Sequence, residues 1–260
     1  MMQVSASDDP SPCLGLGLAA APPFDAGARE ALKRIARQHE PVPPGSRLHE
    51  AGEPFTAIHA VRSGAVKTVR RDASGEERIV AFHLPGEFFG LSAIADGHYA
   101  TSAVTLTTTA VCSLPGQHLF RLACEHAGLQ RQLMRLLSGA IRTEQGQYAA
   151  LAGHNAEVRL AFVLDQLRAR MNHPAHAGAT LRLPMTRAEL GSSVGLAAET
   201  TSRLFHRFTD RGLIEARGRR ITFLDPLALH HLGAPASAAE ASAAAARAAD
   251  HLPVVDSTCS

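Results

Sequence analysis

Five turn signals divide residues 42–115 into short segments, and this punctuation constrains the fold more than any other feature of the chain. The signals are Pro44-Gly45, Ser63-Gly64, Ser74-Gly75, Pro85-Gly86 and Asp96-Gly97. Between them, the stretches 58–72, 76–84 and 102–114 are rich in Val, Ile and Thr, which favours strands. Short strands at this spacing are typical of a compact antiparallel roll or barrel. We therefore predict a β-roll domain over residues 26–116.

The chain changes composition at both ends. Residues 1–25 are rich in Ser, Pro, Ala and Gly, and residues 233–260 are dominated by alanine, so we predict that both are disordered. Residues 26–41 place apolar side chains at helical spacing, which predicts a helix that ends at Pro41.

A long helical segment, residues 117–153, follows the β-roll. Six of its residues fall at spacings of three and four and form a heptad seam, which is typical of helices that pair. These residues are Met134, Leu137, Ile141, Glu144, Tyr148 and Leu151. The alternative is a helix that packs on its own β-roll, but Leu133, Leu136 and Ala140 lie on another face and can make that contact. We therefore predict a dimerisation helix, in which Glu144 meets its own counterpart and weakens association.

Residues 154–232 carry the pattern of a winged helix-turn-helix. An amphipathic helix, a loop and a short strand come first. Thr186 and Glu189 then form the capping-box signature of a helix start, and Gly195 breaks the chain before a second helix. The stretch 212–224 reads as a β-hairpin, the wing. The predicted fold class is therefore α+β: a β-roll, a long helix and a winged helix-turn-helix.

The second helix of this motif has two distinct faces. Thr201, Leu204 and Phe208 lie at i, i+3 and i+7, and we predict that they pack inward on the first helix. The outward residues, at i, i+3, i+4 and i+7, are Glu199, Ser202, Arg203 and His206.

The outward side chains have base-reading chemistry. Arg203 can donate two hydrogen bonds to a guanine, Glu199 can accept one from N4 of a cytosine, and Ser202 can contact a thymine or a phosphate. A surface ion pair between Glu199 and Arg203 is the alternative, but their place early on the second helix of this motif favours base reading. Residues 154–232 hold 11 Arg against 7 Asp plus Glu. Candidates for contacts to the DNA backbone are Arg187, Thr200, His206, Arg207, Arg217, Arg219 and Arg220.

These residues stand in a longer stretch that resembles a known family. The segment MTRAELGSSVGLAAETTSRLFHRFTDRGLIEARGRRITFLD is similar to the winged helix of the CRP/FNR family of bacterial transcription regulators. The segments FHLPGEFFGLSAI and LMRLLSGAI and the motif Glu199-x-x-Ser202-Arg203 look like the FNR branch, and the resemblance covers about residues 40–232. It implies a homodimer that binds inverted TTGAT-like half-sites, recruits RNA polymerase and is tied to oxygen, redox state or anaerobic metabolism. Ala197 takes the place where members commonly have a Ser or Thr cap, so the helix start lacks a side-chain acceptor.

The resemblance also shows which residues of the family's sensor sites are missing from this chain. The stretch 88–104 stands where the cyclic-AMP receptor supplies a Gly-Glu segment and an Arg to its nucleotide, and it contains no Arg. Cys112 matches the β-roll cysteine of the oxygen-sensing type, but the N-terminal cysteine cluster is absent and Cys13 stands alone. A [4Fe–4S] cluster usually needs four thiolates. We therefore assign no cofactor, and an iron–sulfur cluster or a haem is an alternative without supporting residues. Cys112 is either a small buried strand residue or a thiol redox switch.

Composition excludes several other functions. The net charge is only +2, so any basic surface must be local, and no apolar run approaches the roughly 18 residues of a membrane span. The four scattered cysteines suit reduced thiols, so we expect a cytoplasmic protein without a membrane contact. No metal site is predicted: His83 is expected to pack or to satisfy a loop, and His230 and His231 to lie on a solvated face.

Catalysis is not expected either, because no nucleophile–base pair, phosphate loop or paired carboxylate signature is present. The functional alternative to a DNA-binding regulator is a β-roll that senses haem, a small molecule or a cyclic nucleotide, with a helix-turn-helix that acts mainly through protein contacts.

Overall fold

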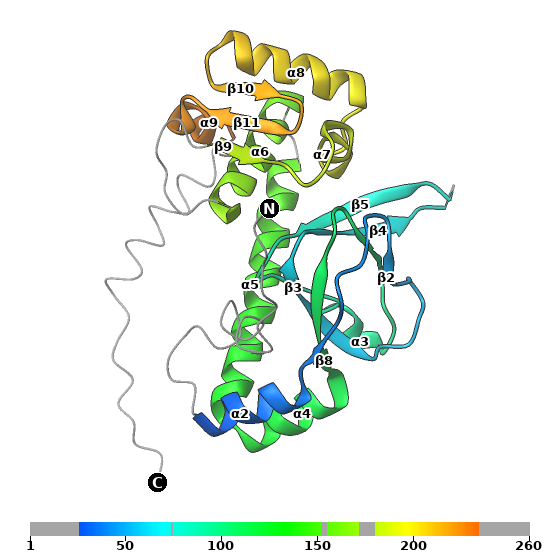
Figure 1. The fold of residues 1–260 in the computed structure, drawn as a ribbon. Coiled ribbons are helices and arrows are strands. Elements are labelled where there is room, and N and C mark those ends of the chain that lie inside the picture. The colour runs from blue at the N-terminus through cyan, green and yellow to red at the C-terminus, as the bar shows by residue number, and fades with distance from the viewer. Residues whose placement is uncertain (1–25, 74, 152–154, 172–179, 234–260) are drawn as a thin grey trace, which may run out of the picture.

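A β-roll, a long helix beside it and a winged helix-turn-helix at one end make up the protein (Figure 1). The structure is a computed structural model that describes residues 26–73, 75–151, 155–171 and 180–233. The two segments predicted to be disordered lie outside the described residues, except for Gly233. The loop expected after the first helix of residues 154–232 lies outside them as well.

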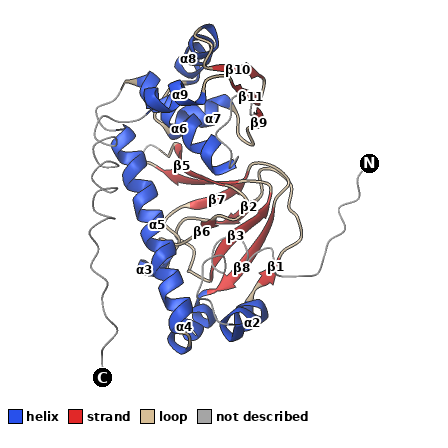
Figure 2. Ribbon diagram, turned by 90° about the vertical axis from the view of Figure 1, so that its left-hand side faces the viewer, coloured by secondary structure: helices blue, strands red, loops and turns tan. Residues whose placement is uncertain are grey.

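The β-roll is built from eight strands of the described chain. They are β1 (Arg37–Gln38), β2 (Arg47–His49), β3 (Ala57–Ser63), β4 (Val66–Arg71), β5 (Glu77–His83), β6 (Phe88–Phe89), β7 (Ser102–Thr105) and β8 (Ala110–Pro115). They form two four-stranded sheets in the orders β1-β8-β3-β6 and β2-β7-β4-β5, and the neighbouring strands pair antiparallel (Figure 2). The antiparallel roll predicted from the turn signals is therefore confirmed.

One of those turns needs its glycine. Gly64 joins β3 to β4 with a φ of 81°, in the left-handed region. A Cβ at this position would also collide with the backbone oxygen of Thr108, so a larger residue would push this turn away from the chain at residues 108–109. Between the sheets, Val61, Val66 and Val111 pack into one of the apolar clusters of the roll.

Helices close one end and one side of the roll. They are α2 (Ala26–Ile35), α3 (Ala93–Asp96), α4 (Gly116–Glu125) and α5 (Ala127–Leu151). Leu32 of α2, Leu119 of α4 and Leu129 of α5 are buried in one cluster with Ile58 and Leu114 of the roll. Leu133 is buried in the same cluster, and so the face of α5 predicted to contact the roll does contact it.

The C-terminal part of the described chain forms the winged helix-turn-helix. Its elements are α6 (Ala156–Met171), β9 (Thr180–Arg182), α7 (Arg187–Ser193), α8 (Ala198–Asp210), β10 (Ile214–Arg217), β11 (Arg220–Phe223) and α9 (Pro226–Gly233). Strands β10, β11 and β9 pair in that order, and the β10–β11 hairpin is the wing. In Figure 1, α7 lies next to the β4–β5 hairpin, whereas α8 lies at the far end of the molecule.

Three predicted elements are wrong in their limits. The helix expected over 26–41 ends at Ile35, because Arg37–Gln38 pair with the edge of β8 instead. The expected strand 102–114 is divided into β7 and β8 by a turn, in which the Thr109 hydroxyl donates to the carbonyl oxygens of Thr107 and Ala65. Such side-chain bonds compete with a continuous ladder.

The third correction concerns the long helix expected over 117–153. It is interrupted at His126, whose φ of −127° and ψ of 98° are extended. Leu119 and Ala123 of α4 pack in the same cluster as Leu129 of α5, and the chain has to turn between them for both helices to reach it.

Candidate nucleic-acid interface

The helix-turn-helix begins with a capping box at the start of α7. The Thr186 hydroxyl accepts from the backbone N–H of Glu189, and the Glu189 carboxylate accepts from the backbone N–H of Thr186. These bonds satisfy two donors that a helix start leaves free. The following turn contains Gly195, with a φ of 67°. The chain therefore turns where the sequence predicts, and α8 begins after Ala197.

Buried residues hold α8 against α7. Thr201, Leu204 and Phe208 are buried, as their spacing predicts. Phe205, four residues after Thr201, is buried as well; this spacing is a signal that the sequence analysis did not use. A Cβ on Gly191 would collide with the Thr201 hydroxyl, which means that the two helices approach more closely than any larger residue at 191 would allow.

The opposite side of α8 presents Glu199, Ser202, Arg203 and His206 to solvent, and we call these four residues the recognition face. Arg203 Nη2 donates to Glu199 Oε1 at 2.5 Å, and the two side chains are 77% and 76% exposed. An exposed i,i+4 pair contributes only about 0.2–0.5 kcal/mol. The pair therefore orients the guanidinium but leaves it free to exchange its partner for a base.

The first turn of α8 lacks a side-chain cap. Ala197 occupies the N-cap with a φ of −64° and a ψ of 151°, which is the usual backbone conformation there, but makes no side-chain hydrogen bond. The Thr201 hydroxyl donates to the Ala197 carbonyl oxygen at 2.9 Å. The sequence predicted this missing cap from the resemblance alone.

The predicted backbone-contacting arginines fall into two groups. Arg187 is half-buried: its guanidinium donates to the carbonyl oxygens of Gly218 and Ala216, at 3.3 Å each, and stacks 4.6 Å from the Phe205 ring centroid. Arg219 donates to the Pro184 carbonyl oxygen at 3.0 Å. Both connect the wing to the α7 side of the motif, which the sequence did not predict.

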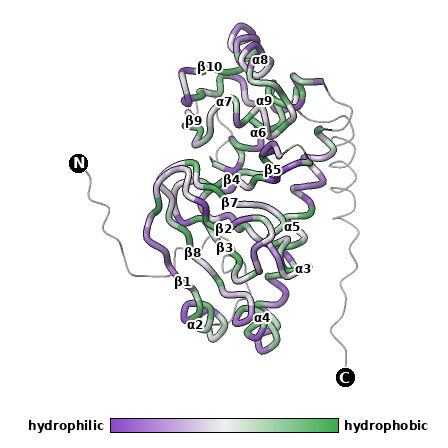
Figure 3. Tube along the Cα trace, turned by 90° about the vertical axis from the view of Figure 1, so that its right-hand side faces the viewer, coloured by the Kyte–Doolittle hydropathy of each residue, from purple (hydrophilic) through white to green (hydrophobic). Residues whose placement is uncertain are grey.

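For the second group no side-chain hydrogen bond to a backbone carbonyl is seen among the described residues. Thr200, Arg207, Arg217 and Arg220 are exposed, and Figure 3 shows hydrophilic residues at the wing tip near β10. Arg207 Nη1 pairs with Glu157 of α6 at 3.2 Å, and Arg217 pairs with Glu215 at 2.7 Å. Arg211, which the sequence analysis did not select, pairs with Glu157 too. Glu157 therefore anchors the C-terminal half of α8 to α6.

A row of apolar side chains along α5 is open to solvent. Met134 and Ile141 are 55% exposed, Tyr148 is 75% exposed and Leu151 is 37% exposed. Leu137 is half-buried and Glu144 is exposed. The predicted seam residues therefore lie on a face of α5 that this single chain leaves largely uncovered.

The interior of the β-roll holds a cluster of rings that the sequence analysis missed. His49 stacks on Tyr99 with ring centroids 3.8 Å apart, and His59 stacks on Phe89 at 5.1 Å. His49 and His59 are 5% and 9% exposed. Burial lowers the pKa of His49 to about 4 and that of His59 to about 3, so both are neutral at pH 7. β3 is buried at five successive residues and β2 is only three residues long, so no alternation in the sequence marks these two histidines as inward-facing.

A hydrogen-bond chain fixes the form of His59. The Tyr99 hydroxyl donates to the Ala57 carbonyl oxygen at 2.7 Å, so its oxygen can accept from His59 Nε2–H at 3.3 Å. His59 Nδ1 then accepts from the Ser113 hydroxyl at 2.8 Å, and Ser113 Oγ accepts from His39 Nε2–H at 2.7 Å. A proton on His59 Nδ1 would force Ser113 and His39 to exchange their donor and acceptor roles, which adds to the free-energy cost of charging the imidazole.

The other cysteine and histidine residues considered in the sequence lie where they were expected. Cys112 is buried at 1% exposure on β8, as expected for a small strand residue. His83 meets the Thr68 hydroxyl at 3.2 Å, in keeping with its expected packing role. His230 and His231 are exposed, as expected, and His230 Nδ1 lies 2.8 Å from Asp165 Oδ2. Asp165 of α6 also binds Arg168 of the same helix. Its contact with His230 joins α9 to α6.

Within the described ranges, no three His, Cys, Asp or Glu side chains are grouped as metal ligands. A buried Cys112 and an exposed Cys124 are the cysteines there, and they do not fit a four-thiolate cluster. No helix of the described residues is long and apolar enough to cross a membrane.

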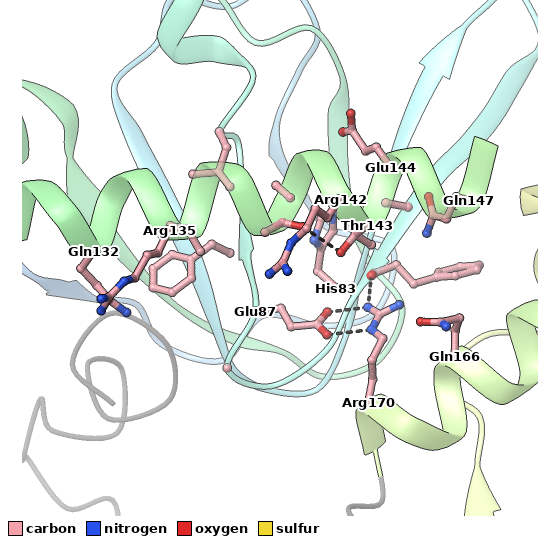
Figure 4. Close-up of a pocket in the computed structure, with 18 residues that line it drawn as sticks. His83, Glu87, Gln132, Arg135, Arg142, Thr143, Glu144, Gln147, Gln166 and Arg170 are labelled. Carbon is pink, nitrogen blue, oxygen red and sulfur yellow. Dashed lines mark hydrogen bonds and ion pairs between the residues drawn. The ribbon is translucent and has the colours of Figure 1, made fainter. Parts of the chain in front are cut away.

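A cavity of about 560 Å³ separates α5 from the end of α6 and the β5–β6 turn. Figure 4 shows Arg142, Thr143 and Gln147 of α5 on one side of it and Gln166 and Arg170 of α6 on the other. Charged side chains of both signs line it together with apolar ones, among them Phe82, Leu91 and Leu136. The cavity meets the stretch 88–104 only at Phe88 and Leu91.

Comparison with known proteins matches both halves of the chain. A family model described as a cyclic nucleotide-binding domain matches residues 39–126, and one described as a Crp-like helix-turn-helix domain matches residues 158–232. The transcriptional activator protein Anr of Pseudomonas protegens is 41% identical over 200 residues, which cover 77% of this chain and 82% of the relative. The fumarate and nitrate reduction regulatory protein of Escherichia coli is 36% identical over 201 residues, 77% of this chain and 80% of the relative. The solved structure of FixK2 from Bradyrhizobium japonicum superposes with a TM-score of 0.70 at 28% identity, covering 78% of this chain and 99% of that one.

Proposed function

The chain belongs to the CRP/FNR family of DNA-binding transcription regulators, and from that premise we propose that it binds inverted TTGAT-like half-sites as a homodimer. The observation that carries the proposal is the recognition face of α8. Glu199, Ser202 and Arg203 follow the E-x-x-S-R pattern, and all three are exposed on one side of a helix whose other side is buried.

Each of the three residues has a distinct role in this proposal. Arg203 donates two hydrogen bonds to O6 and N7 of the guanine in a half-site. Glu199 accepts from bases of the opposite strand, and its bond to Arg203 orients the guanidinium until the guanine takes its place. Ser202 contacts a thymine or a phosphate. A good bidentate contact of this kind discriminates against a wrong base by about 1–3 kcal/mol.

The arginines outside the recognition face give affinity rather than specificity. We assign phosphate contacts to four exposed residues, namely Arg217 and Arg220 on the wing, Arg207 on α8 and Thr200 at the start of α8. Arg187 and Arg219 bond backbone carbonyls, so we assign them to the support of the wing first and to phosphates second.

The exposed apolar face of α5 supports the proposed homodimer. Met134, Ile141 and Tyr148 are more than half exposed, and pairing two such helices would bury them. A two-fold axis along α5 would present two recognition faces to DNA, which is why we expect inverted half-sites. Glu144 in the same face opposes pairing, since it would meet its own counterpart.

The names of the relatives suggest the setting. They include a fumarate and nitrate reduction regulatory protein and a transcriptional activator, so we propose that this protein controls genes of anaerobic or redox metabolism through RNA polymerase. We propose a cytoplasmic location for it, since a regulator of this kind has to reach DNA. The sequence lacks the N-terminal cysteine cluster, with cysteines only at 13, 112, 124 and 259, so we do not assign it an iron–sulfur cluster.

Fluorescence anisotropy with labelled duplexes tests this function. Wild-type protein should bind a palindrome of TTGAT half-sites more tightly than a scrambled duplex of equal length. Arg203→Ala should remove that preference and leave salt-sensitive non-specific binding. Arg217→Ala is the control: it should weaken both duplexes equally and lower the salt slope by about one phosphate contact.

Two results would contradict the proposal. Equal affinity of the wild type for both duplexes would favour the alternative in which the helix-turn-helix acts through protein contacts. An Arg203→Ala variant that keeps the preference would remove Arg203 from base reading.

A further inference from the structure

The winged helix-turn-helix is attached to the β-roll of its own chain through Arg170, near the C-terminal end of α6. Arg170 Nε donates to Glu87 Oε1 at 2.7 Å, and its Nη2 donates to Glu87 Oε2 at 2.5 Å (Figure 4). The same Nη2 donates to the Phe82 carbonyl oxygen at 2.6 Å. Glu87 is itself held by the backbone N–H of Leu84 at 2.9 Å. A bidentate ion pair of this kind fixes the orientation of the guanidinium as well as its distance from the carboxylate.

A second ionic contact joins the two parts at a different element. Lys67 Nζ on β4 lies 2.8 Å from Glu189 Oε1 on α7. Burial alone would raise the pKa of Glu189, but hydrogen bonds from Lys67 and Thr186 lower it overall, so the carboxylate stays ionised. The other oxygen of Glu189 completes the capping box of α7. One carboxylate therefore serves both the helix start and the contact with the roll.

Apolar packing lies beside these ion pairs. Ala65, Phe82 and Leu84 of the roll are buried in the same cluster as Leu160 of α6 and Leu190 of α7. The side chains of Arg170 and Lys67 are only 23% and 21% exposed, so both ion pairs are partly shielded from water. Ion pairs in this position are stronger than surface pairs.

The docked position leaves the recognition face free. Glu199 and Arg203 are about three-quarters exposed, and α8 lies on the far side of the domain from the roll (Figure 1). Contacts on both α6 and α7 resist rotation as well as displacement. The docked domain is therefore held in an orientation in which it can approach DNA.

We propose that Arg170 and Lys67 are positioning residues for DNA recognition: with Glu87 and Glu189 they fix α8 relative to the β-roll and so set the spacing of half-sites that the protein accepts. This inference rests on the proposed function, because spacing has meaning only for a dimer on paired half-sites. Neither residue needs to touch DNA. They keep the two recognition faces of the dimer at a fixed separation, so the DNA does not have to deform to contact both of them.

Spacing variants of the operator provide the test. A random duplex pool is first selected with wild-type protein, and the preferred sequence is then lengthened or shortened by one and two base pairs between its half-sites. We expect Arg170→Gln to weaken binding to the preferred spacing roughly five- to tenfold. The loss of affinity between the preferred and the altered spacings should be smaller for this variant than for the wild type. Its affinity for non-specific DNA and the salt dependence of its binding should match the wild type.

Matched variants separate positioning from folding. Exchanging the charges in Arg170→Glu with Glu87→Arg should recover part of the spacing preference. Glu189→Gln retains the capping-box acceptor but loses the charge that binds Lys67. It should therefore also weaken the preference for one half-site spacing, and it keeps the test possible if Arg170→Gln does not fold. Arg135→Gln, an exposed residue that lines the same cavity, should behave as the wild type.

Several outcomes would overturn the inference. Unchanged spacing preference in Arg170→Gln and Glu189→Gln would overturn it, as would equal losses on every duplex. Tighter binding by these variants would make the docked position inhibitory, which is the opposite conclusion. A wild type that selects a single half-site contradicts the dimer proposal and this inference together. A wild type that selects paired half-sites, with variants identical to it, contradicts the inference alone.

Discussion

Acid should destabilise this protein through the two histidines buried in its β-roll. His49 and His59 have pKa values of about 4 and 3 in the folded chain, against 6.5 for an ordinary imidazole, and burial is the main cause of both shifts. For a base with a lowered pKa, the unfolded state binds the proton first. The stability is therefore complete above pH 6.5 and is lost as the pH falls towards the folded values.

The magnitude follows from the interval between pH 6.5 and the pH of the assay. At pH 5, each imidazole is almost fully protonated in the unfolded chain and almost fully neutral in the folded one. The interval of about 1.5 pH units at 1.36 kcal/mol per unit gives roughly 2 kcal/mol per histidine, or roughly 4 kcal/mol for the pair. That is a large part of the 5–15 kcal/mol that stabilises a typical domain.

Urea unfolding followed by far-ultraviolet circular dichroism, at pH 8, 7, 6 and 5, measures this loss. Other groups also titrate in this range, so the informative quantity is the difference between variants. His49→Phe keeps a ring to stack on Tyr99 but cannot bind a proton, and it should reduce the loss of unfolding free energy between pH 8 and pH 5 by roughly 2 kcal/mol. His118→Gln removes an exposed histidine of α4 and should leave the loss as in the wild type. If His49→Phe and wild type lose stability in parallel, the assignment of acid sensitivity to this cluster is refuted.

Three further substitutions test the interface and the dimer. Ala197→Ser should stabilise the C-terminal domain by about 1 kcal/mol, because the N-cap backbone is ready for an acceptor that alanine lacks; an unchanged melting temperature would contradict this. Gly191→Ala should destabilise the domain by about 1–3 kcal/mol in urea unfolding, because the new methyl group collides with Thr201, and Thr201→Ala in the same chain should restore part of the loss. Glu144→Ala should lower the dimer dissociation constant in analytical ultracentrifugation, and a constant equal to that of the wild type would remove Glu144 from the control of dimerisation.

Local patterns predicted a large part of the fold. The turn glycines and β-branched segments predicted the antiparallel roll, because alternation and turn chemistry act within a few residues. The capping box at Thr186 and Glu189 and the buried face at Thr201, Leu204 and Phe208 were predicted for the same reason. The break at His126 was missed, since helical periodicity continues across it and only the packing of both helices on one cluster requires the turn.

What the sequence did not predict depends on residues far apart in the chain. Arg170 and Glu87 are 83 positions apart, and Lys67 and Glu189 are 122 positions apart. The sequence does not show whether the guanidinium of an arginine contacts a phosphate, a carboxylate or a carbonyl oxygen. Arg187 illustrates this: its motif suggests a DNA contact, whereas its partners are two carbonyl oxygens of the wing and an aromatic ring.

The match to a cyclic nucleotide-binding domain describes the architecture of this roll better than its chemistry. In the stretch 88–104, Phe89 and Tyr99 are 2% and 3% exposed, and Tyr99 is stacked on His49. A nucleotide would have to displace such rings, at about 1.5–3 kcal/mol for each buried side chain, and its phosphate would find no arginine in that stretch. A signal that acts through this roll is therefore expected to reach the DNA-binding domain from outside the ring cluster. In the described residues, the roll is joined to the DNA-binding domain by α5, by the ion pairs at Glu87 and Lys67, and by the apolar packing beside them.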